Sequence, residues 1–571
     1  MKRGAILKKN SLRLPVFLYG FLPAACCLLK GLSDRLYTDI DSFLISINCA
    51  GLYGESNLCP VLHPLVGLLT NGLNHLYPNV DWFTALGQFF TIVAVWWIGV
   101  LLAFCIQQPF KRWTCLLLFS LVLLQQSLLN QNFTVYAGLF AAVAVATLLL
   151  SFRRSLPRIS YFMVVLFICL AILWRKEGTA LILPFLILDL CVLALSKVLT
   201  WQHIRRVLVL ALLPATLLLT ISLGTNITLP AQGIAVSYGQ YRAKLIDYPH
   251  HSWEDIYEEL TPLSISENDY AAITKGILLD TDLVTASTLE KISAVATTSE
   301  FSFSPNTIFL LLGSLPSVFN TQLLRSFILL ALGLFVGILC SHLPPLYKLE
   351  AFLALGGSCL ICLYYLYIGR LPERVTACIL LAFITTLLPL FLCIPASHIP
   401  AIKSVWQISS ILVIGLLCIF LIQNRYNYRI VQPVWQARQA EVSDFSLRPE
   451  QDADSIYLWN STLLALYMTD HYMDEGKLPD TAFLRQNLAW GEWNTSGQIT
   501  YQQLLSGLGV ANPMQSLLNR PHTYLVGEKN DIILIQTWLR EHYDTTATAE
   551  QIDTIDVFAV GKIPIWQIAN E

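Results

Sequence analysis

The sequence predicts a polytopic α-helical membrane protein that ends in a small α/β domain. Two features of the 571-residue chain lead to this prediction. First, 55% of the residues are hydrophobic and only 13% are charged, whereas an ordinary soluble protein is about 25% charged. Second, long apolar runs recur along most of the chain. This composition excludes a soluble enzyme, a disordered chain and a nucleic-acid binder of the basic type.

Eleven apolar runs approach the roughly 20 residues that a helix needs to cross a bilayer, so we expect about 11 transmembrane helices. The first run follows Lys2, Arg3, Lys8 and Lys9 and lacks a convincing cleavage site, which favours an uncleaved membrane helix over a signal peptide. The runs lie near residues 14–30, 84–106, 114–129, 134–151, 159–174, 178–196, 207–224, 324–342, 350–368, 375–393 and 407–423.

The distribution of charge predicts the orientation of these helices. Lys and Arg concentrate in the N-terminal segment and in alternate short loops, which the positive-inside rule assigns to the cytoplasm. The long polar segments 225–323 and 424–571 then fall outside, and both are acidic: the first has 11 Asp and Glu against 4 Lys and Arg, the second 18 against 10. We therefore predict a cytoplasmic N-terminus and an extracytoplasmic C-terminal domain.

The predicted spans and orientation divide the chain into a membrane domain over residues 1–423 and an α/β domain over residues 424–571. The membrane domain includes a first outer loop, 31–83, and a long outer loop, 225–323. In the two long polar segments, helical patterns cover Trp253–Leu260, Asp269–Leu279, Ser461–Met473 and Asp531–Tyr543, and strand-like runs cover Ile456–Trp459, Thr523–Val526 and Asp556–Val560.

The first outer loop contains the most informative polar residues. Asp39 and Asp41 follow the first apolar run, where two nearby carboxylates can share a metal ion, or one can act as a base while the other raises its pKa. Two solvated loop carboxylates are the alternative. His63 precedes a proline and is either a hydrogen-bonded structural group or a site residue. Cys49 and Cys59 flank a polar stretch, where a disulfide is possible if the loop faces an oxidising compartment.

Basic residues at the outer ends of later helices oppose the positive-inside rule, which favours a functional anion partner. Arg175 and Glu177 lie between two apolar runs, and Arg370 and Arg374 precede another. Guanidinium groups fit phosphate oxygens, although a short turn with an exposed ion pair would give the same pattern. Asn132 lies in a stretch of amides that either lines a cavity or caps a turn, and a turn is slightly favoured.

At these residues the chain resembles the GT-C class of integral membrane glycosyltransferases. The resemblance is to the bacterial branch related to dolichyl-phosphate-mannose mannosyltransferases and aminoarabinose lipid A transferases. It rests on the acids of the first outer loop, on Gly51–Gly54 and Pro60–Pro64, on the Asn132–Thr134 stretch, and on the charged positions Arg175, Glu177, Arg370 and Arg374. It covers roughly residues 14–423 as architecture, and its motifs are short.

The resemblance implies a transferase of the bacterial plasma membrane that takes a sugar from a polyprenyl-linked donor to a glycan or glycolipid acceptor. Asp39 or Asp41 would be the catalytic base, and a divalent cation, Mg²⁺ or Mn²⁺, could bridge them to the donor phosphate. Membrane lipids are the other expected partners, and no nucleic acid is expected. A polysaccharide polymerase and a lipid-linked sugar transporter or flippase are the alternatives. The phosphate would bind Arg175, Arg370 and Arg374, and the substrates would contact Tyr53, His63, Glu177 and Asn132.

Overall fold

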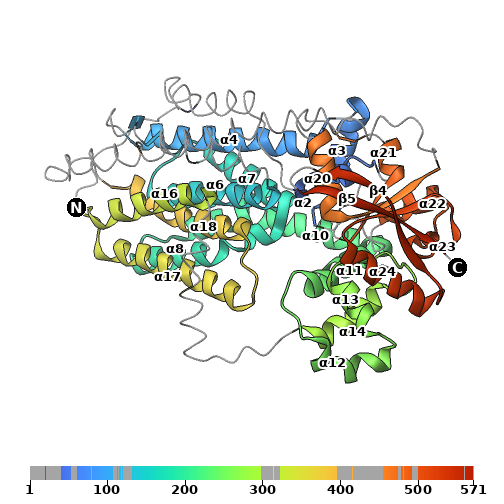
Figure 1. Cartoon of the computed structure of the whole chain (residues 1–571). Helices are drawn as coiled ribbons and strands as arrows, with labels where there is room; N and C mark the ends of the chain where they lie inside the picture. The colour runs from blue at the N-terminus through green and yellow to red at the C-terminus, as the bar shows by residue number, and fades with distance from the viewer. Residues whose placement is uncertain are drawn as a thin grey trace, which may run out of the picture.

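The computed structural model shows a bundle of long apolar helices beside a smaller unit that contains a β-sheet (Figure 1). We call these parts the helix bundle, formed by α4, α6–α10 and α16–α18, and the polar unit, formed by the described residues within 230–297 and 454–569. The structure describes residues 40–52, 61–78, 80–106, 132–297, 322–394, 454–472, 481–491, 499–557 and 560–569, together with a few isolated positions.

Among the described residues, six helices are long and apolar enough to cross a membrane, which is consistent with a membrane-embedded protein. They are α4 (Trp82–Cys105), α6 (Phe133–Arg153), α7 (Ile159–Ala180), the continuous helix Trp201–Thr228, α17 (Pro345–Tyr367) and α18 (Glu373–Leu392). The continuous helix comprises α9 (Trp201–Val207), the π-helical turn η1 (Leu208–Leu212) and α10 (Leu213–Thr228). Many leucines on α10 and α17 are exposed, as a lipid-facing surface requires.

The predicted number of eleven spans is not confirmed. The runs predicted at 178–196 and 324–342 form the apolar helices α8 (Leu183–Leu195) and α16 (Gln322–Leu339), which do not meet the length and hydropathy of a full span in the described residues. The predicted runs 14–30, 114–129 and 407–423 lie mostly outside the described residues.

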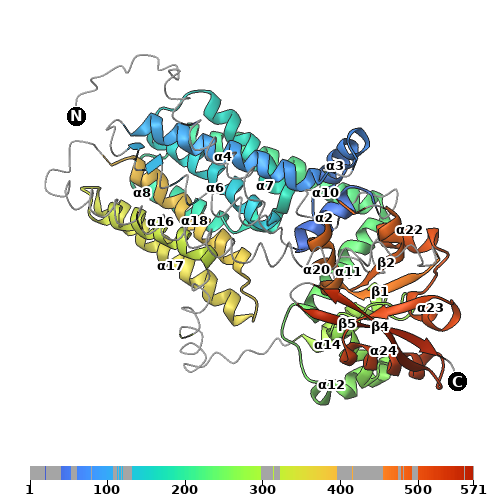
Figure 2. The ribbon, with the colours of Figure 1, turned by 45° about the horizontal axis from the view of Figure 1, so that its top comes forward.

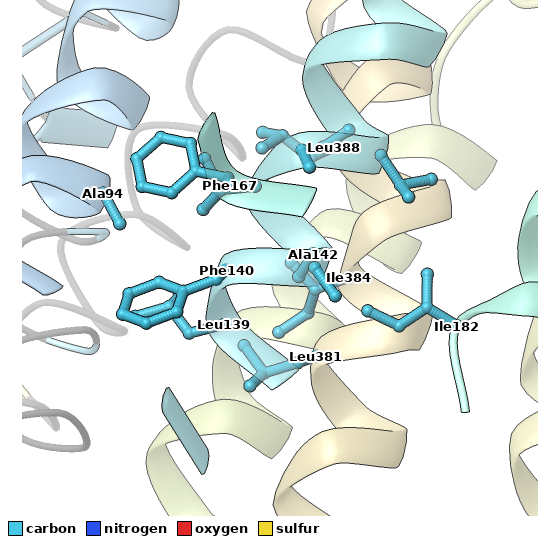
Figure 3. Close-up of a cluster of buried hydrophobic side chains, with 14 of the residues drawn as sticks. Ala94, Leu139, Phe140, Ala142, Phe167, Ile182, Leu381, Ile384 and Leu388 are labelled. Atoms are coloured by element: carbon cyan, nitrogen blue, oxygen red, sulfur yellow. The ribbon is translucent and has the colours of Figure 1, made fainter. Parts of the chain in front are cut away.

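Helix α6 forms the centre of the bundle and is buried from Phe133 to Phe152. Its sequence is rich in alanine, and small residues allow neighbouring helices to approach closely. At Gly138, a β-carbon would lie 2.6 Å from Cys378 Sγ of α18, so only glycine fits there without a shift. Figure 3 shows Leu139 and Phe140 of α6 packed among the apolar side chains of this core, with Phe167 of α7 and Leu381 of α18 nearby.

The polar unit contains a five-stranded sheet in the order β2-β1-β3-β5-β4, in which β1 pairs in parallel with β2 and β3, and β5 pairs antiparallel with β3 and β4. This confirms the small sheet-containing domain expected at the C-terminus. Its strands are β1 (Ile456–Asn460), β2 (Asn487–Trp490), β3 (Thr523–Val526), β4 (Thr548–Val557) and β5 (Gly561–Ala569), and its helices are α20 (Ser461–Tyr472), α21 (Thr481–Gln486), α22 (Ile499–Gly507), α23 (Pro513–Asn519) and α24 (Lys529–His542).

The long polar segment after α10 shares one hydrophobic core with this sheet. Leu260 and Leu289 of the segment are buried in the same cluster as Trp459 of β1 and Trp538 of α24. The segment and the described part of the C-terminal chain, from residue 454 onward, thus fold together. The segment forms α11 (Pro230–Ile246), α12 (Trp253–Leu260), the 3₁₀ turn η2 (Thr261–Leu263), α13 (Glu267–Thr274) and α14 (Ala286–Ala296).

A buried carboxylate, Asp280, connects the two halves of the polar unit. Its Oδ2 accepts hydrogen bonds from Trp538 Nε1 at 2.9 Å and from the Tyr543 hydroxyl at 2.6 Å. Its Oδ1 accepts one from Asn512 Nδ2 at 2.9 Å and two from backbone N–H groups of its own loop. Because a buried carboxylate needs such donors, this residue fixes the position of the segment on the sheet.

Replacement of Asp280 is expected to loosen the polar unit. Asp280→Ala should lower the free energy of unfolding by about 3 kcal/mol, because buried donors lose a charged acceptor. The measurement is the unfolding transition of the full-length protein in detergent micelles. Glu259→Ala removes an exposed acid of α12 and should change the value by about 0.5 kcal/mol or less. Equal stability of the two variants would contradict the role given to Asp280.

Candidate functional site

Helix α2 (Ile40–Cys49) lies where the helix bundle meets the polar unit (Figure 2). Phe43 and Ile47 contribute to the core of the polar unit, whereas Ile45 and Cys49 contribute to that of the bundle. The N-terminal end of α2, which contains Asp41, therefore lies at the junction of the helix bundle and the polar unit. The candidate site is built around this end.

Asp41 forms an ion pair with Arg374, which lies in the first turn of α18. The distance from Asp41 Oδ2 to Arg374 Nη1 is 2.5 Å. The two side chains are 20% and 25% exposed, so the pair is accessible from water rather than enclosed in the bundle. The structure thus brings together two of the residues that the sequence singles out, although they are 333 positions apart.

Arg175 lies next to this pair because α7 is interrupted at that residue. Its backbone is extended, with φ −167° and ψ 110°, between two helical stretches. The guanidinium donates a hydrogen bond to Thr134 Oγ1 at 2.7 Å and lies 4.8 Å from the centroid of the Phe133 ring. It also interacts electrostatically with Arg374 and Asp41. Two guanidinium groups therefore lie close together with one carboxylate nearby.

Glu177, the acid expected to contact substrate, lies beside Arg175. The distance from Glu177 Oε2 to Arg175 Nε is 3.7 Å, and the Glu177 side chain is more than half exposed. An exposed pair of this kind contributes little stability. Glu177 is thus a weak partner that leaves the Arg175 guanidinium available to other groups.

Arg370 lies on the adjacent rim, against the polar unit. Its Nη2 is 2.7 Å from Asp247 Oδ2, and its guanidinium lies 4.8 Å from the centroid of the Tyr248 ring. The preceding Gly369 has φ +72°, a conformation that favours glycine, and a β-carbon there would meet the ring of Pro249. Arg370 is therefore held by the 247–249 turn, and the structure does not bring it into contact with Asp41.

Asn132 and His63 occupy helix starts. Asn132 Oδ1 accepts hydrogen bonds from Thr134 N and Val135 N and so caps α6, as the turn interpretation predicts. His63 Nδ1 accepts from Leu65 N at the start of α3 (Pro64–Leu76), and Nε2 lies 2.9 Å from the Leu218 carbonyl oxygen. A ring that accepts at Nδ1 and donates at Nε2 is neutral, in agreement with burial lowering the pKa of His63.

Two serines of α2 form hydrogen bonds to the starts of two other helices, α6 and α4. These contacts were not predicted from the sequence. Ser42 Oγ accepts a hydrogen bond from Phe133 N of α6, and Ser46 Oγ donates one to Asp81 Oδ1 at 2.7 Å. Asp81 caps α4 by accepting from Thr84 N, and burial raises its pKa. An aspartate directly before an apolar run is a helix-capping signal, so Asp81 could have been found from the sequence.

The remaining residues predicted for the site are described only in part. Asp39 and Tyr53 lie outside the described residues. Cys49 and Cys59 are both buried, and their thiols hydrogen-bond to each other. This bond is the main cause that raises the pKa of Cys49 and lowers that of Cys59. Their proximity is compatible with the disulfide considered above, which stays a prediction.

Asp41 Oδ2 lies against the Arg374 guanidinium, and we derive no step through a divalent ion. Among the described residues, one group of three side chains has ligand atoms close enough for a metal, and it lies in the polar unit: Asp269, Glu541 and His542. The 2.8 Å bond between His542 Nε2 and Asp269 Oδ1 already explains that arrangement.

No protein-family model matches this chain, and no curated protein and no solved structure is significantly similar to it. The resemblance to the GT-C class therefore depends on the short motifs themselves, and it stays a prediction.

The contacts of His63 lead to a test of its role. His63→Ala should lower the free energy of unfolding by about 1–2 kcal/mol, because a helix cap and a buried hydrogen bond are lost. His75→Ala removes an exposed histidine of the same helix and should have little effect. Stability should also fall as the pH drops below about 6.5, where the unfolded chain binds a proton that the folded ring resists. This pH-dependent loss should be smaller in His63→Ala. Unchanged stability of that variant would argue for a purely substrate-binding role.

Proposed function

We propose that this protein is a membrane glycosyltransferase that transfers a sugar from a polyprenyl-phosphate-type donor to a cell-envelope acceptor. The observation that carries the proposal is the meeting of Asp41 with Arg374 and Arg175 where the apolar helices end against the polar unit. A lipid-linked donor requires a site with this combination: apolar helices for its tail and fixed positive charge for its phosphate. The reaction would take place at the outer face of a bacterial plasma membrane.

The charges of the site favour a phosphate ligand. Arg374 lies in the first turn of α18 (Glu373–Leu392), where the helix dipole adds to the attraction for an anion. A donor phosphate would compete with Asp41 for the Arg374 guanidinium, since both are anions and the pair is accessible to water. Arg175, which is hydrogen-bonded to Thr134, would then contribute a second guanidinium. Arg370, which is held by Asp247, would take part only at the rim.

This exchange would also prepare a base. In the resting protein the Arg374 guanidinium occupies Asp41 Oδ2, the oxygen that would have to accept the proton. Once phosphate takes the guanidinium, Asp41 Oδ2 can accept a proton from the acceptor hydroxyl. The hydroxyl oxygen would attack the anomeric carbon, the bond to the phosphate would break, and the arginines would stabilise the leaving phosphate. A single displacement of this kind inverts the anomeric centre. Asp39, two positions earlier, is the alternative base.

The proposal is tested by substitution in the native host. Arg374→Gln, Arg175→Gln, Asp41→Asn and Asp39→Asn are compared with Lys176→Gln, a matched control that removes an exposed charge next to Arg175. Loss of a phosphate-stabilising donor or of the base should lower transfer about 100-fold or more. Surface glycans are measured by mass spectrometry, with membrane levels and unfolding transitions recorded for each variant.

Loss of one specific sugar in the arginine variants and in one aspartate variant, but not in Lys176→Gln, would support the transferase. The aspartate whose replacement abolishes transfer would be the base. If all four variants fold and every glycan is retained, the site and the proposed reaction are wrong.

A further inference from the structure

A second group of charges lies inside the helix bundle, remote from the site described above. It consists of Arg153 at the end of α6, Asp189 in α8 and Glu350 in α17. Since α6 starts next to the candidate site and is 21 residues long, a rise of 1.5 Å per residue places Arg153 roughly 30 Å away. This cluster is therefore independent of the proposed function.

The contacts of the cluster leave two carboxylate oxygens without a donor. Arg153 Nη2 is 2.7 Å from Glu350 Oε1 and 3.7 Å from Asp189 Oδ1. Thr386 Oγ1 of α18 donates a hydrogen bond to Asp189 Oδ2 at 2.8 Å. Asp189 Oδ1 and Glu350 Oε2 are buried and have no hydrogen-bond donor, and Arg153 Nε is buried without an acceptor. The two carboxyl groups nevertheless lie within hydrogen-bonding reach of each other.

The charges of Asp189, Glu350 and Arg153 do not balance if both acids are ionised. The side chains of Asp189 and Glu350 are both 0% exposed, and that of Arg153 is 6% exposed. If both acids were ionised, one guanidinium would face two carboxylates, and the buried cluster would carry one uncompensated negative charge. Such a charge is costly away from water. Two adjacent carboxyl groups that share one proton remove this charge and supply a donor for the unpartnered oxygens.

Other titratable groups near the cluster do not supply that positive charge. Just after α6, Arg154 donates to the Cys105 carbonyl oxygen. On α17, the Tyr347 ring lies below the Arg153 guanidinium, and Lys348 Nζ donates to the Leu339 carbonyl oxygen. Cys393, just after α18, faces Arg153, Arg154 and Glu350 and is itself not cationic. Among the described residues around the carboxyl groups, Arg153 is thus the one cation that pairs with them.

We infer that Asp189 and Glu350 form a buried proton-binding site, in which the two carboxyl groups hold one proton between them next to Arg153. The ligand is a single proton. The site joins α6, α8, α17 and α18, so binding of this proton is coupled to the packing of four helices of the bundle.

The experiment measures how the stability of the full-length protein depends on pH. Equilibrium unfolding in mixed micelles is recorded between about pH 6 and 8 for the wild type, Asp189→Asn and Glu350→Gln. Unfolded Asp and Glu are ionised in this range, so the folded wild type binds one more proton than the unfolded chain. Its folding equilibrium constant should fall about tenfold per pH unit relative to either amide variant, because each amide replaces the protonated partner. Glu259→Gln, at an exposed acid, should follow the wild type.

Three further results decide the inference. The double variant Asp189→Asn/Glu350→Gln should be far less stable than either single variant, because Arg153 is then buried without a counter-charge. Infrared spectra of the wild type should contain a protonated carboxyl band that decreases in the amide variants. Parallel pH profiles of wild type and single variants would overturn the inference, and so would failure of both single variants to fold. A wild-type stability that depends on Na⁺ concentration rather than on pH would also overturn it, because a metal cation would then supply the charge.

Discussion

The structure depends on the burial of α2 between two hydrophobic cores. Ile45 and Cys49 belong to the core of the helix bundle, and Phe43 and Ile47 belong to the core of the polar unit. A helix with one free face can rotate or slide, whereas α2 is held from both sides. The position of Asp41 relative to Arg374 is consequently determined by the packing of two cores rather than by the flexible geometry of a loop.

The same burial explains which elements the sequence predicts. A lipid-facing or fully buried helix needs a long apolar run, so the runs 134–151 and 375–393 correspond closely to α6 and α18. Strand Thr523–Val526 is predicted with the observed bounds because it is short, apolar and flanked by polar residues. Strand β5 is missed because Pro564 interrupts an alternating pattern, and proline within a run argues against a central strand. β5 nevertheless pairs on both edges.

The candidate site is predictable in residue type but not in pairing. The sequence identifies Asp41, Arg175 and Arg374 because charges next to apolar runs are unusual. It does not identify that Asp41 meets Arg374, since contacts between residues hundreds of positions apart follow from packing. It also cannot separate a capping residue from a ligand-binding residue, because both are polar groups at helix starts. Asn132 shows this ambiguity, and its hydrogen bonds to the first turn of α6 resolve it in favour of a cap.

Burial, rather than residue type, distinguishes the Asp41–Arg374 pair from the Arg153 cluster. The Arg374 and Asp41 side chains retain a quarter and a fifth of their exposure, so the pair is in contact with water. Arg153, Asp189 and Glu350 are almost fully enclosed, and separation of their charges would leave an ion in an apolar interior. The Asp41–Arg374 pair is therefore suited to exchange ligands. The Arg153 cluster is suited to keep four helices in one arrangement, and the component that it can exchange is a proton.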